Sequence, residues 1–231
     1  MATIKAGFDV FETSGEAYFT IPSGFGIPGG FFHKDSQPWT GLMTFTGYPV
    51  RKFEDPRTGK VFDTGAADTF VERKQDVTIQ KVPGTGSSPI QLVKLRLRSC
   101  RPIEVQVGRV VQRWDVEVDV SQTKPSSGTI TITQTSDQGG TFNSELTIWP
   151  LFKFVHRTTG EERLLDMGAL RIPAEKQAVV ASVNTLVAAE VPFTLAPAAD
   201  TFALPELTGN FAAAIIAHHS HLIGPVKTLL Q

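Results

Sequence analysis

The side chains best suited to chemistry in this sequence are three histidines near its C-terminal end, His218, His219 and His221. On a strand, His219 and His221 would point to the same side and could share one metal ion through neutral imidazole nitrogens. A third ligand would have to come from elsewhere, with His33, His156 or a carboxylate as the candidates. The competing interpretation is a polar end to an apolar segment, with solvated imidazoles. We therefore predict no required cofactor and keep a histidine-bound metal ion as the alternative.

A row of acidic residues offers a second candidate for chemistry. Asp115, Glu117 and Asp119 alternate with apolar residues, so on a strand they would share one face. A calcium loop curves around its ion, whereas alternate strand residues lie in a straight row. This favours a solvated strand face opposite basic residues such as Arg96 and Arg98 over a cation site. A catalytic pair of carboxylates would also need a cleft, which a flat strand does not supply.

Four aromatic residues form the third candidate: Phe25, Phe31, Phe32 and Trp39, set among glycines and prolines. Rings on such a segment can stack on sugars or fill a groove of another subunit. They can also seal the open end of a sheet sandwich. We predict that residues 25–39 form a binding or interface surface, with core packing as the alternative.

Composition excludes several classes of function. The chain has 231 residues, 41% of them hydrophobic, and a formal net charge of −1 with acids and bases interleaved. Binding to nucleic acid by charge needs a basic stripe, so we predict no nucleic-acid partner. The apolar runs are too short to span a bilayer, so we predict no transmembrane segment. The glycines form neither a phosphate-binding loop nor a nucleophile elbow, which together with the flat acidic row predicts a protein that is not an enzyme.

The sequence pattern predicts that the elements positioning these residues are strands. Apolar residues alternate with polar ones over 114–120, and similar patterns cover 103–107 and 129–133. Residues 145–155 form another strand region, in which Pro150 predicts a bend or an edge. Turn-rich composition predicts a loop at 83–89, hairpin tips at 55–60 and 157–161, and an extended linker over 192–205. The sequence therefore predicts an all-β, sandwich-like fold.

An internal similarity bears on domain organisation. Residues 36–46 align with residues 123–133 at one constant offset, which pairs Pro38 with Pro125 and Gly41 with Gly128. We interpret this as two related β units. The predicted division is 1–108 for the first unit, 109–173 for the second and 174–231 for a small C-terminal extension packed on them. One continuous domain is the alternative.

Several of these segments also resemble a pattern found in secreted or surface bacterial β-rich proteins without a known activity. The resemblance covers most of the chain through turn and strand signatures, and some of these proteins carry a leader peptide and a C-terminal sorting helix. It implies an extracellular or cell-surface location, although this sequence shows no signal peptide. The segments that carry the resemblance are residues 21–32, 36–41, 47–50, 67–73, 139–144 and 208–211.

These observations lead to a ranked set of functions. The first is a non-catalytic structural or interaction protein that assembles with itself at the cell surface. The second is a module that binds a carbohydrate or another small ligand through the aromatic segment, and the third is a metal-dependent enzyme. The expected partners are a second copy of the chain, another surface protein or a glycan.

Overall fold

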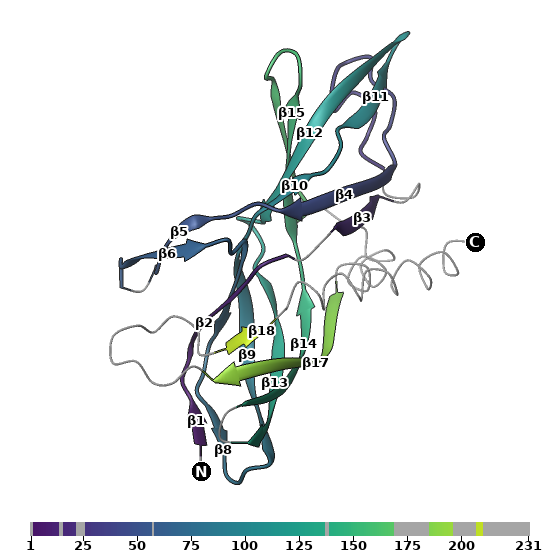
Figure 1. Cartoon of the computed structure of the whole chain (residues 1–231). Coiled ribbons are helices and arrows are strands. Elements are labelled where there is room, and N and C mark those ends of the chain that lie inside the picture. The colour runs from purple at the N-terminus through teal and green to yellow at the C-terminus, as the bar shows by residue number, and fades with distance from the viewer. Residues whose placement is uncertain are drawn as a thin grey trace, which may run out of the picture.

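The computed structural model describes residues 2–13, 16–21, 26–56, 58–136, 139–168, 185–195 and 207–209, all as strands and their connections (Figure 1). The predicted all-β, sandwich-like fold is confirmed. Within these ranges there is no helix with the length and apolarity needed to cross a membrane.

Two seven-stranded antiparallel sheets make up most of the molecule, and we call them the upper and lower sheets after their places in Figure 1. The upper sheet has the order β16-β15-β12-β10-β4-β3, with β11 paired to β12. The lower sheet has the order β18-β17-β14-β13-β9-β7-β2. The upper strands are β3 (Ala17–Ile21), β4 (Gly41–Gly47), β10 (Leu97–Ser99), β11 (Ile103–Val107), β12 (Val110–Val120), β15 (Pro150–His156) and β16 (Glu162–Asp166). The lower strands are β2 (Gly7–Phe11), β7 (Thr69–Arg73), β9 (Gly84–Leu95), β13 (Ser126–Ser136), β14 (Gly139–Thr147), β17 (Thr185–Leu195) and β18 (Leu207–Gly209).

Two small two-stranded sheets complete the described structure. β1 (Ala2–Ile4) pairs with β8 (Val77–Ile79), and β5 (Arg51–Glu54) pairs with β6 (Val61–Gly65). The β5–β6 hairpin extends away from the body at the level of the boundary between the large sheets (Figure 1).

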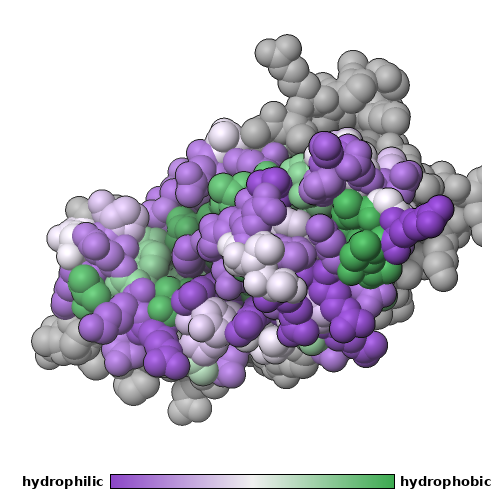
Figure 2. Space-filling model, turned by 90° about the horizontal axis from the view of Figure 1, so that it is seen from above, coloured by the Kyte–Doolittle hydropathy of each residue, from purple (hydrophilic) through white to green (hydrophobic). Residues whose placement is uncertain are grey.

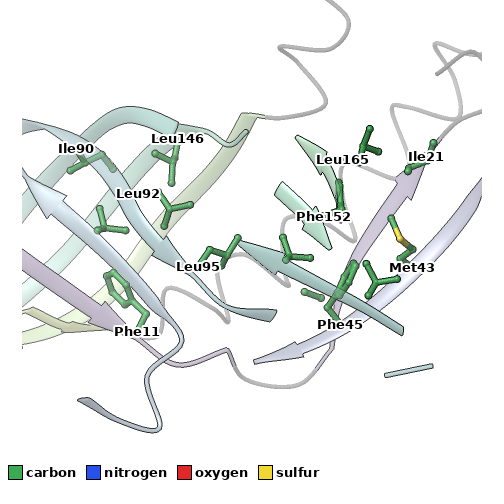
Figure 3. Close-up of a cluster of buried hydrophobic side chains, with 14 of the residues drawn as sticks. Phe11, Ile21, Met43, Phe45, Ile90, Leu92, Leu95, Leu146, Phe152 and Leu165 are labelled. Atoms are coloured by element: carbon green, nitrogen blue, oxygen red, sulfur yellow. The ribbon is translucent and has the colours of Figure 1, made fainter. Parts of the chain in front are cut away.

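Both large sheets curl around apolar side chains. In the lower sheet β18 comes back beside β2, and Phe11 of β2 meets Phe142 of β14 across the interior at 6.2 Å between ring centroids. In the upper sheet Phe19 of β3 meets Phe152 of β15 at 5.0 Å. The two interiors join into one core, with Leu95 at the junction (Figure 3).

The chain passes between the two sheets several times. β9 leads into β10 at Arg96, β12 leads into β13 through residues 121–125, and β14 leads into β15 at residues 148–149. Each large sheet therefore contains strands from both sides of residue 109, which itself lies in the turn between β11 and β12. The division into related units at this residue remains a prediction.

Strand predictions from alternation agree with the structure. Trp114, Val116 and Val118 are buried on β12, whereas the acids between them are half-buried on the other face. The hairpin tips at 55–60 and 157–161 are confirmed, and Pro150 begins β15 directly after the chain changes sheets.

Two predictions of irregular structure are wrong in part. Residues 84–89, expected in a loop, form the first half of β9 between β7 and β13. Their glycines serve close packing: a Cβ on Gly84 would lie 2.2 Å from Lys81 O, and one on Gly86 would lie 2.6 Å from Val77 Cγ1. Residues 192–195, expected in a linker, belong to β17, and residues 196–205 lie outside the described ranges.

Candidate functional site

The predicted aromatic segment closes the open end of the upper sheet. Gln37 N donates to Gln106 O of β11 at 3.0 Å, and Ser36 forms a bridge with Val107. On the opposite side of this end, Arg163 Nε of β16 donates to Phe31 O at 3.2 Å. Residues 26–40 thus span the sheet from β11 to β16.

Two of the predicted interface rings pack inside the chain. Phe32 is 1% exposed, with its ring centroid 5.2 Å from Trp114 and 5.1 Å from Phe154. Phe31 is half-buried and meets Phe32 edge-on at 4.9 Å. For these two rings the arrangement is the core packing given above as the alternative to an interface, and it stabilises the end of the sheet.

The other two predicted rings have different positions. Trp39 is half-buried, and its Nε1 donates to Glu104 O at 3.0 Å. Its ring lies over Gly41, where a Cβ would be 3.2 Å from the ring. Phe25 lies outside the described residues, and the role of both as an interface remains a prediction.

The acidic row of β12 is matched by basic groups. Asp115 Oδ2 accepts from Arg157 Nε at 3.0 Å, and Asp119 forms an ion pair with Lys94. Glu117 lies between Arg98 of β10 and Lys153 of β15 in the sheet register, and Arg98 is the neighbour expected from the sequence. A hydrogen bond to Glu162 raises the pKa of Lys153, and the charge of Glu117 adds to this. Local charge is therefore balanced on this face.

Two of the histidines named in the metal hypothesis, His33 and His156, lie in the described part of the chain. His218, His219 and His221 lie outside the described residues. His156 Nδ1 is 2.8 Å from Thr159 Oγ1, and His33 Nδ1 accepts from Asp35 N at 3.2 Å. In the described ranges no group of three or more His, Cys, Asp or Glu residues could hold a metal ion. The metal site remains a prediction.

Large apolar side chains are exposed at places that the sequence interpretation did not select. Val110 is 64% exposed and Val111 is 51% exposed, next to the two-residue turn Gly108-Arg109 that joins β11 to β12. Gly108 has a φ of 56°, which suits the first central position of a tight hairpin turn. Two apolar runs separated by a glycine-containing pair could have indicated this hairpin.

Further exposed aliphatic residues lie on other protruding or peripheral strands. Val61 is 57% exposed on the β5–β6 hairpin, and Leu164 is 60% exposed on β16 at the edge of the upper sheet. Seen from above, the upper end of the molecule has separate apolar patches on a mainly hydrophilic surface (Figure 2). The candidate contact points are the exposed residues Val61, Val110, Val111 and Leu164.

A buried ion pair lies at one end of the lower sheet. Arg73 Nε donates to Asp9 Oδ2 at 2.8 Å, and Arg73 Nη1 donates to Lys5 O at 2.5 Å. Both side chains are almost fully buried. Burial raises the pKa of Asp9 to about 6, although the charge and hydrogen bond of Arg73 oppose the shift.

A second buried carboxylate, that of Asp68, binds the start of β7 and the connection between β2 and β3. Asp68 accepts from Thr69 Oγ1 at 2.6 Å, from Thr13 N at 2.7 Å and from Thr13 Oγ1 at 2.9 Å. Burial raises the pKa of Asp68, and these hydrogen bonds oppose the shift. Gly47 packs so closely here that a Cβ would lie 2.0 Å from Asp68 Oδ2. Three hydrogen bonds and this close packing hold the carboxylate in place.

Comparison of the chain with protein-family models, with curated protein sequences and with solved structures finds no match.

Proposed function

We propose that the protein is a non-catalytic structural or interaction protein that associates with copies of itself. The observation that carries this proposal is the pair of exposed valines, Val110 and Val111, at the end of the β11–β12 hairpin. This hairpin extends beyond the body of the upper sheet (Figure 1). The cell surface is the location we propose, from the resemblance to surface β-rich proteins.

The position of the valines supports a contact role. Successive strand residues point to opposite faces, so Val110 and Val111 present apolar groups on both sides of the hairpin end. Natural proteins protect peripheral strands with charged residues, whereas Arg109 lies in the turn and leaves both valines uncovered. Burying one valine contributes about 1.5 kcal/mol, which corresponds to about a tenfold change in affinity.

The carbohydrate alternative receives less support from the described side chains. Stacking on a sugar requires an open ring face. Among the described side chains Tyr48 is the aromatic residue most exposed, at 39%, and the Arg96 guanidinium lies 4.2 Å from its ring centroid. One face of this ring is therefore already occupied.

Light scattering coupled to size exclusion, on untagged protein over a range of concentrations, tests the proposal. We expect a defined oligomer or larger assemblies in the native protein. The double variant Val110→Thr/Val111→Thr keeps the β-branched shape and should weaken assembly by about a hundredfold in dissociation constant. Arg109→Lys changes the same turn without removing apolar area and should assemble normally. A native protein that stays monomeric at every concentration would overturn the proposal.

A further inference from the structure

The β5–β6 hairpin is attached to the body through a small apolar contact separate from the main core. It forms its own two-stranded sheet, which is hydrogen-bonded to neither large sheet. Phe53 of β5 stacks on Phe70 at 4.6 Å and meets Phe8 edge-on at 5.1 Å. These two residues belong to β7 and β2 and face away from the interior of the lower sheet. The hairpin thus has a defined seat, which we call the Phe8–Phe70 seat.

Both connections of the hairpin contain left-handed backbone. Lys52 N donates to Val50 O at 2.9 Å, which closes a γ-turn around Arg51 with a φ of 67°. This geometry is rare and strained for a residue with a Cβ. On the return, Gly65 has a φ of 56°, and Ala67 N donates to Thr64 O at 3.0 Å. The two connections lie side by side, because Arg51 pairs with Gly65.

We propose that copies of this protein associate by exchanging the β5–β6 hairpin, so that Phe53 of one copy occupies the Phe8–Phe70 seat of another. The inference rests on the proposed self-association and adds a second contact to that of Val110 and Val111, with a second copy of the chain as the partner. The seat already accepts this hairpin within one chain, so the exchanged pair forms the same ring contacts. The difference lies in the connections, where opening allows Arg51 to leave its left-handed conformation. Short, strained connections of this kind favour domain swapping.

Two substitutions at the connections should change association in opposite directions. Arg51→Gly removes the penalty of the left-handed conformation from the closed monomer, so the association constant should fall by about tenfold. Gly65→Ala adds such a penalty, and a Cβ there meets no atom within 4 Å, so the constant should rise by about tenfold. Arg51→Lys keeps both the charge and the Cβ and is the matched control. Equal association constants in all three variants would overturn the exchange.

Isotopic mixing identifies the exchanged contact directly. We would replace Phe53 with p-azidophenylalanine, mix unlabelled and ¹⁵N-labelled chains after brief unfolding, and cross-link the refolded oligomer by light. Exchange predicts cross-links from position 53 to the peptides of Phe8 or Phe70 that join one labelled and one unlabelled chain. An oligomer whose cross-links all lie within one chain would refute the exchange and leave the self-association intact. A protein that is monomeric throughout would refute both.

Discussion

The buried pair of Asp9 and Arg73 gives a quantitative prediction about stability and pH. Burial raises the pKa of Asp9 from 3.8 to about 6, with the attraction of Arg73 already acting against the shift. Because the pKa is raised in the folded state, Asp9 contributes stability that is fully present below pH 3.8 and lost as the pH rises through about 6. A shift of this size corresponds to about 3 kcal/mol.

The perturbation that isolates this effect is Asp9→Asn, which keeps the shape and removes the charge. We expect the free energy of unfolding of the native protein, relative to that of the variant, to fall by about 2–3 kcal/mol between about pH 4 and pH 7.5. Urea titrations followed by tryptophan fluorescence at several pH values would measure it. The comparison uses a difference between two proteins, so the titration of other groups cancels.

Asp76→Asn is a control with the opposite sign. A hydrogen bond from Lys5 lowers the pKa of Asp76, so its contribution is present at neutral pH and lost as the pH falls. The free energy of unfolding of the native protein minus that of Asp76→Asn should therefore grow as the pH rises. The free energy of unfolding of the native protein minus that of Asp9→Asn should instead fall as the pH rises. If it stays constant or grows, the attraction of Arg73 outweighs the burial of Asp9 and the reasoning is wrong.

Two further substitutions test the packing described above. Gly47→Ala should lower the free energy of unfolding by about 1–3 kcal/mol, because the added carbon would lie 2.0 Å from Asp68 Oδ2. Gly7→Ala, whose added carbon finds its nearest neighbour at 4.0 Å, is the control in the same urea titration, and equal losses would contradict this explanation. Phe32→Ala should destabilise the protein by about 3–5 kcal/mol in thermal or urea unfolding, since the ring is buried in the core. Phe31→Ala should have a smaller effect, and the reverse order would show that Phe31 is the main anchor.

The fold class was predictable from the strands that have one face buried and the other exposed to solvent. β12 shows this best, because Trp114, Val116 and Val118 alternate with acids, two of which form ion pairs with basic residues elsewhere in the chain. β9 could not be read in the same way. Its first half is built from glycine, serine and threonine, which are typical of turns. Its glycines are required by the close approach of Lys81 and Val77, and this packing produces no alternation of apolar and polar residues in the sequence.

The candidate site was harder to predict than the fold. An aromatic ring in a glycine- and proline-rich segment has the same sequence signature whether it fills the core or a partner's groove. Phe32 fills the core because residues 36 and 37 attach to β11, and this pairing links positions far apart in the sequence. The exposure of Val110 and Val111 could not be predicted from the sequence, because valine in a strand normally indicates burial. Only the position of the hairpin end, beyond the rest of the sheet, makes them a surface feature.

The return of β18 to the side of β2 has a consequence for how the protein is made. A ribosome delivers about 5–20 residues per second, so Phe11 emerges roughly ten seconds or more before Leu207. During that time the side of β2 that later faces β18 has no neighbour, and from its own synthesis until that of residues 185–195 the edge of β14 has none either. Nascent chains on the same messenger carry identical open edges at close distance. Premature pairing between them is the hazard that this topology creates, and chaperone dependence during synthesis is its expected cellular sign.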